Sequence, residues 1–172
     1  MFSAARSTGS IPTMSTPLVE QREQQLEAWK RFLRAHAALT RQLSADLVAE
    51  HGLTINDYEV LLHLSRADEQ RLRRVDLAER VILTASGITR LLEGLEHGGY
   101  VERDSCPSDR RVVYAKLTDA GLDKLREASR THLAGVDELF VQRYSEEERA
   151  TLAELLGRLP AAGADTDCTE EE

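Results

Sequence analysis

The sequence predicts a mainly α-helical chain with a small β-hairpin wing, that is, a winged helix-turn-helix fold with a helical dimerisation domain. Apolar residues recur at intervals of three and four through most of the chain, which is the period of an amphipathic helix. Between residues 100 and 117, two short β-like runs flank a Pro-Ser-Asp turn, which is typical of a hairpin. Because this segment directly follows two short, closely spaced helices, the hairpin is expected to be the wing.

Capping residues place the helices that precede the hairpin. Gly52, after His51, suits the end of the first helix, and Thr54 is a good N-cap for the second, with Asp57 in its first turn. Leu83-Thr84 opens the fourth helix, which is expected to end at Gly98-Gly99. The four helices are expected over about residues 29–51, 54–64, 74–81 and 84–98.

The hairpin is followed by two more helices. Its strands are expected at Tyr100–Arg103 and Val112–Leu117. Thr118-Asp119-Ala120-Gly121 then starts a long fifth helix. The run from Ser145 to Glu148 reads as a capping box, which opens a sixth helix that continues to Leu159.

Length and composition fit one domain between two tails. The chain has 172 residues, of which 41% are apolar and 30% charged, as in an ordinary globular protein. Residues 1–18 are rich in Ser and Thr without periodicity, and residues 160–172 are small and acidic, so both are expected to be disordered tails. Met14 is an alternative start to Met1.

Several classes of protein lack support in the sequence. No run reaches the roughly 18 apolar residues that a membrane helix needs, and residues 1–16 lack the apolar stretch of a secretory signal, so a cytoplasmic protein is expected. Two cysteines, Cys106 and Cys168, make no disulfide framework. The five histidines have no metal-ligand spacing, and neither a phosphate-binding loop nor a nucleophile elbow is present. Neither an enzyme nor a metal or other cofactor is expected.

Charge is distributed unevenly along the chain. The formal net charge is −8, which seems to argue against a nucleic-acid partner. The segment from Arg71 to Lys116, however, contains nine basic and seven acidic residues, whereas the rest of the chain contains 13 basic and 23 acidic residues. Since the local field governs the approach to phosphates, this segment is the natural candidate for contact with DNA.

The fourth expected helix has a polar face suited to reading DNA. Ser86 and Arg90 lie on that face and Thr89 flanks it, and such side chains can donate to phosphates and reach base edges in a major groove. An ordinary surface helix is the alternative, because these residue types are common on surfaces. The opposite side, expected to face the core, comprises Ala85, Ile88, Leu91, Leu92 and Leu95.

The turn of the hairpin carries Asp109-Arg110-Arg111. Two cations at a protruding tip suit insertion into a minor groove, whose negative potential attracts arginine. Asp109 could orient a guanidinium through a charge-assisted hydrogen bond. An ordinary polar turn is the alternative interpretation.

Taken together, these motifs resemble the multiple-antibiotic-resistance regulator (MarR) family. The hallmark is the wing, with Asp109 and Arg111, a short apolar strand, Leu117-Thr118 and Gly121. The resemblance covers about Trp29 to Leu159 and also rests on these stretches: Asp76–Arg80, Ser86–Leu92, Leu95-Glu96, Gly98–Arg103 and Pro107–Arg111.

The resemblance implies an obligate homodimer that binds a pseudo-palindromic double-stranded operator, with recognition helices in major grooves and wings in minor grooves. By position, Arg111 matches the wing arginine and Asp109 its partner, while Ser86, Thr89 and Arg90 match the reading face. The domain would span residues 19–159, with a DNA-binding lobe at about 54–117 and dimerisation helices at about 20–50 and 119–159.

Many members of the family release DNA when a small aromatic or anionic molecule binds between the dimer helices and the DNA-binding lobe. Trp29, His36, Tyr58 and His63 are candidates to line such a cleft. For His36, which lies on the apolar stripe of the first helix, a core or interface role is the alternative.

Peroxide sensing, known in some members through a cysteine near the start of the first helix, is not supported, because no cysteine precedes Cys106. Arg103 and Arg110 could lower the pKa of Cys106, and a neutral or structural role is the alternative.

The sequence therefore predicts a DNA-binding transcriptional regulator, with repression favoured because a dimer on a promoter blocks polymerase without an activating contact. The alternative function is a winged helix used as a protein-interaction module, which would need neither Arg111 nor a hydroxyl-rich recognition face.

Overall fold

The computed structural model describes residues 22–23, 26–81, 83–105 and 113–159. Both expected tails and the tip of the wing, with Cys106 and Asp109-Arg110-Arg111, lie outside the described residues. The described residues up to Ala38 and those from Leu39 onward form two compact units. The helix α2 (Glu27–His51) contains the boundary between them.

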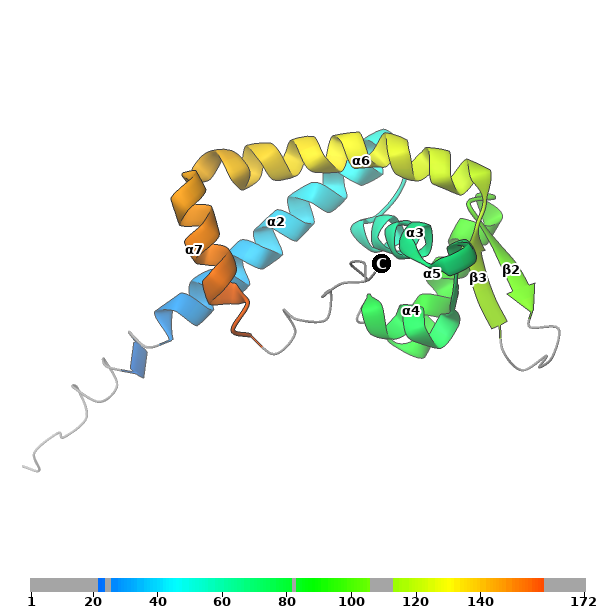
Figure 1. The fold of residues 1–172 in the computed structure, drawn as a ribbon, viewed down its shortest axis with the longest axis horizontal. Coiled ribbons are helices and arrows are strands. Elements are labelled where there is room, and N and C mark those ends of the chain that lie inside the picture. Colours follow the sequence, from blue (N-terminus) through cyan, green and yellow to red (C-terminus); the bar gives the residue numbers. More distant parts are fainter. Residues whose placement is uncertain (1–21, 24–25, 82, 106–112, 160–172) are drawn as a thin grey trace, which may run out of the picture. The chain divides into compact units, whose positions relative to one another are not determined.

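The order of elements confirms a mainly α-helical, winged helix-turn-helix fold (Figure 1). The helix-turn-helix consists of α4 (Arg74–Arg80) and α5 (Ala85–His97). The hairpin that follows consists of β2 (Val101–Ser105) and β3 (Val113–Leu117). The remaining elements are α3 (Ile55–Arg66), the 3-10 turn η1 (Asp68–Gln70), β1 (Arg71–Arg73), α6 (Asp119–Leu139), the 3-10 turn η2 (Val141–Arg143) and α7 (Glu146–Leu156).

The capping contacts expected from the sequence are present. At the start of α3 the Asp57 carboxylate accepts a hydrogen bond from the Thr54 backbone N–H at 2.8 Å, and the Thr54 hydroxyl oxygen accepts one from the Asp57 N–H at 3.2 Å. Ser145 and Glu148 form the same reciprocal pair at the start of α7. These bonds satisfy backbone donors that have no partner inside the helix, which fixes where each helix begins.

The sheet has three strands where the sequence predicted two. β1 pairs antiparallel with β3, so that Leu72 lies opposite Ala115 and the strand order is β1-β3-β2. With only three residues, two of them arginines, β1 is too short to show a strand pattern. The pairing of β1 with β3, which lies far along the chain, stabilises β1. The periodicity of a local stretch of sequence does not indicate such a distant partner.

A continuous apolar core holds α5 in place. The side chains of Leu61, Leu64, Leu77 and Leu92 are fully buried, so α3, α4 and α5 all contribute to this core. Leu117 of the wing and Leu125 of α6 belong to the same cluster. Helix α5 is therefore fixed by packing on its inner side, which leaves its outer side available.

The second strand of the wing runs directly into α6 (Figure 1). At this junction the Thr118 hydroxyl donates to the Gly99 carbonyl at 2.7 Å, and its oxygen accepts from the Gly121 N–H at 3.0 Å. The Tyr100 carbonyl accepts from the Thr118 N–H at 3.1 Å. The Leu117-Thr118 and Gly121 motif therefore ties the end of α5 to the start of α6.

Candidate nucleic-acid interface

The outer face of α5 carries the predicted reading residues. Ser86 and Arg90 are exposed and Thr89 is half-buried, whereas Ile88 and Leu92 on the other side are buried. Thr84 caps the helix, since its hydroxyl oxygen accepts from the Gly87 N–H at 3.1 Å. The first two turns of α5 therefore have the rigid inner side and polar outer side that the sequence predicted.

Ala85 was expected to face the core, and that prediction is wrong. Its side chain is exposed. Ala85 lies at the edge of the apolar stripe and is the first residue of α5. Whether such an edge position is buried depends on a neighbouring element that covers it, which the helical period alone cannot reveal.

Most cations near the helix-turn-helix are neutralised by carboxylates. Arg80 and Arg90 are exposed, and within the described part of the chain neither has an ion pair or a hydrogen bond from its side chain. They are therefore the described cations of this segment best placed to meet a phosphate or a base. The paired cations are Arg71 with Asp104 and Glu69, Arg73 with Asp76, Arg103 with Glu96, and Lys116 with Glu102.

A charged cluster holds the base of the wing. Arg71 of β1 donates from Nη1 to the Asp104 carboxylate at 2.9 Å, and its guanidinium also pairs with Glu69 and lies 5.1 Å from the centre of the Tyr114 ring. The hydrogen bond to Asp104 is the largest influence that raises the pKa of Arg71 above its ordinary value. This contact between β1 and β2 had no signal in the sequence, because it depends on the unexpected third strand.

Asp109, Arg110 and Arg111 lie outside the described residues, as does Cys106. The structure describes the hairpin up to Ser105 and again from Val113, with Ser105 opposite Val113 in the antiparallel register.

The four candidate ligand residues occupy different settings. Trp29 and His36 are exposed on α2, with the Phe32 ring 6.1 Å from Trp29 and 6.3 Å from His36 between ring centres. Tyr58 and His63 lie on α3, where His63 is half-buried. Their shared role in a cleft stays a prediction.

Tyr58 is a core residue of the unit that begins at Leu39. Its side chain is 5% exposed, and its ring centre lies 4.5 Å from that of His132 on α6. Its hydroxyl lies 3.4 Å from the Ser129 hydroxyl. Burial lowers the pKa of His132, which favours the neutral form of the imidazole packed against Tyr58.

The described residues hold neither a metal-binding cluster nor a helix that could cross a membrane. No group of three or more His, Cys, Asp or Glu side chains there is arranged to hold a metal ion. No helix in the same ranges combines the length and the hydropathy required to cross a bilayer.

Two short helices followed directly by a paired hairpin define the winged helix-turn-helix class of DNA-binding proteins. The model of the MarR family matches residues 53–113. AbsC, a MarR family transcriptional regulator from Streptomyces coelicolor, is 34% identical in sequence, and its crystal structure matches 84% of this chain and 93% of its own with a TM-score of 0.70. The chain belongs to the MarR family.

Two further relatives bear on function. The structure of Sco3205, a MarR family transcriptional regulator from Streptomyces coelicolor in complex with DNA, is 30% identical and covers 86% of this chain and 89% of its own, with a TM-score of 0.72. The transcriptional repressor YetL of Bacillus subtilis is 32% identical over 111 residues, which are 64% of this chain and 66% of YetL. The family and these relatives are transcriptional regulators, so this chain is one as well and not an enzyme.

Proposed function

We propose that the protein is a homodimeric repressor that binds a pseudo-palindromic operator and is released by a small molecule. The observation that carries the proposal is the outer face of α5, where Arg90 is exposed and has no ion pair or hydrogen bond from its side chain among the described residues. The DNA complex of Sco3205 and the repressor function of YetL support it. A chromosomal target also favours a cytoplasmic location.

Binding to DNA upstream of its own gene, measured by gel shift, tests this function directly. We expect a discrete complex that survives an excess of unrelated duplex, because specific complexes are typically 10³–10⁷ times tighter than non-specific ones. If the protein binds all duplexes equally or binds none, the result would instead favour the alternative function, in which the winged helix is a protein-interaction module.

The wing is proposed to add affinity through Arg111, with Asp109 orienting it and Arg110 assisting. Arg111→Ala should weaken operator binding by about tenfold or more and should flatten the dependence of log K on log salt by about one unit for each phosphate that is no longer neutralised. Asp109→Ala should do less, and neither variant should move the melting temperature, because charged residues of a hairpin turn are expected to contribute little to the stability of the core. Unchanged binding by Arg111→Ala at every salt concentration would place the wing outside the groove.

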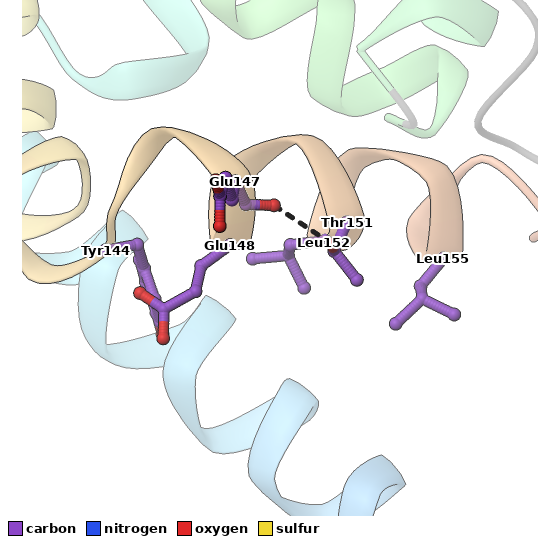
Figure 2. Close-up of a pocket in the computed structure, with 6 residues that line it drawn as sticks. All are labelled: Tyr144, Glu147, Glu148, Thr151, Leu152 and Leu155. Atoms are coloured by element: carbon purple, nitrogen blue, oxygen red, sulfur yellow. Dashed lines mark hydrogen bonds between the residues drawn. The ribbon is translucent and has the colours of Figure 1, made fainter.

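Dimerisation is proposed because apolar side chains line surfaces that no described residue covers. Leu133 on α6 is 62% exposed and Leu155 on α7 is 49% exposed. Figure 2 shows Leu152 and Leu155 projecting from the same side of α7. A lone chain would keep these side chains in water, which is unfavourable.

Light scattering at micromolar concentration should therefore give twice the chain mass of 19.2 kDa. Leu155→Glu should shift the population toward the single-chain mass, because it places a charge in the proposed interface. Val75→Glu is the matched control, since Val75 is 63% exposed on α4, outside the proposed dimerisation helices. A wild-type mass of one chain contradicts the proposal.

Release by an effector is proposed to use the neighbourhood of Trp29, His36, Tyr58 and His63. An effector must bind the state that cannot bind DNA more tightly, typically by about 1–3 kcal/mol. A panel of phenolic compounds should therefore contain one that both raises the melting temperature and weakens operator binding. A panel with neither effect counts against this site.

A further inference from the structure

The outer part of α5 carries two residues with methyl groups in addition to the exposed Arg90. Ala85 is exposed at the first position of the helix, and Thr89 follows one turn later. Residues four apart lie on the same side of a helix, as do Ser86 and Arg90 on the adjoining row. The N-terminal half of the recognition helix therefore has an apolar row next to a polar one.

The hydroxyl of Thr89 is already engaged within the helix. It donates to the Ala85 carbonyl at 2.8 Å, so its hydrogen is not available to a partner outside. What Thr89 retains for such a partner is its Cγ2 methyl group and a lone pair on the hydroxyl oxygen. In this conformation Thr89 cannot donate to a base, which narrows the role expected for it from the sequence.

Ser86 is also held close to the cap of the helix. Its hydroxyl lies 3.2 Å from that of Thr84, whose oxygen accepts from the Gly87 N–H. Arg90, by contrast, has no side-chain hydrogen bond among the described residues. Among the described residues, the strongest donor on this face without a hydrogen bond is therefore the Arg90 guanidinium, and the adjoining row of the helix consists of Ala85 and Thr89.

This combination matches a particular pattern of base edges. Thymine is the base that displays a methyl group in the major groove, where alanine and threonine methyl groups contact it, and arginine reads O6 and N7 of guanine. We propose that Ala85 and Thr89 determine specificity by contacting thymine methyl groups in the half-site in which Arg90 reads guanine. The inference rests on the proposed operator binding and adds the chemistry of the sequence that is read.

Replacing thymine by deoxyuridine tests the contact, because it removes the methyl group and keeps base pairing. The operator is first selected from random duplexes, and each thymine of a half-site is then replaced in turn. At one or more thymines, we expect the deoxyuridine substitution to weaken operator binding about fourfold for each methyl contact that is lost. When the same thymine is replaced in both half-sites, we expect binding to weaken about fifteenfold. Ala85→Gly should abolish this sensitivity at the thymine that Ala85 contacts.

Ala120→Gly provides the matched control for backbone effects. Ala120 is likewise exposed in the first turn of a helix, but it lies on α6, outside the recognition helix. This variant should keep the full sensitivity to deoxyuridine. The decisive quantity is the ratio of the affinities of one variant for the thymine and the deoxyuridine operators. A general loss of stability lowers both affinities by the same factor, so it does not change this ratio.

Two substitutions of Thr89 separate its methyl group from its hydroxyl. Thr89→Val keeps a methyl group and should remain sensitive to deoxyuridine at a second thymine, whereas Thr89→Ser loses the methyl group and should not. The opposite result would assign Thr89 to hydrogen bonding and overturn its part of the inference.

The remaining outcomes separate this inference from the proposed function. If the wild-type protein binds a selected operator but no thymine is sensitive, or if Ala85→Gly and Thr89→Ser keep every sensitivity, the methyl contacts are absent and operator binding stands. If the selection recovers no preferred duplex, both the operator-binding function and this inference fail.

Discussion

Replacing Gly121 by alanine is expected to lower the free energy of unfolding by about 3 kcal/mol or more. A Cβ atom at this position would lie 2.0 Å from the Tyr100 carbonyl oxygen and 2.8 Å from a methyl group of Leu117. The Tyr100 carbonyl oxygen is a backbone atom, so it cannot move aside as a side chain could. It also accepts a hydrogen bond from the Thr118 N–H. Relief would therefore require α6 to move away from the start of the wing.

Gly94→Ala is the matched control for this experiment. A Cβ atom at Gly94 would have no neighbour within 4 Å, and the residue lies inside α5. Because alanine is the better helix former, Gly94→Ala should stabilise the protein by about 0.5–1 kcal/mol. Both values come from urea unfolding at one protein concentration. Equal stabilities for the two variants would show that the junction adapts and that Gly121 is not required there.

Arg90→Ala is expected to weaken binding to the operator by roughly 1–3 kcal/mol and binding to random DNA by far less. The reason is that the Arg90 guanidinium, which has no ion pair among the described residues, can meet a guanine edge without first breaking an ion pair such as those of Arg73 and Arg103. Binding isotherms on operator and random duplexes, each at several salt concentrations, measure both losses. Equal losses on the two duplexes would show that Arg90 contacts only phosphates.

Arg126→Ala is a suitable control for the change in net charge. Arg126 is an exposed arginine on α6 that pairs with Asp123, so its removal changes the same formal charge outside the recognition helix. We expect operator binding to change little. A loss as large as that of Arg90→Ala would mean that the general field, and not a base contact, governs the affinity.

Much of the fold could be read from local chemistry. Thr54, Thr84, Thr118 and Ser145 were expected to cap or open helices, and each accepts a hydrogen bond from a backbone N–H in the first turn. Caps are predictable because the hydroxyl and the donors that it satisfies lie within three residues of each other. The two strands of the hairpin were equally predictable, because they lie close together in the sequence.

The exposed face of α5 was also predictable in large part. Ser86 and Arg90 are exposed as the helical period requires, and Ile88, Leu92 and Leu95 are buried. The wing arginines, by contrast, rest on the sequence resemblance, since residues 106–112 are not described.

The sequence by itself thus determined the order of the helices, the residues that open most of them, the hairpin strands and the inner side of α5, all of which depend on residues a few positions apart. It placed the end of the last helix at Leu159, whereas α7 ends at Leu156. Tertiary structure decided the third strand, the exposure of Ala85 and the pairing of Arg71 with Asp104. The third strand and the ion pair each need a partner from a distant part of the chain. The exposure of Ala85 depends on whether an element from a distant part of the chain packs over it. Local periodicity carries no information about such contacts, because the chain must first fold to bring them together.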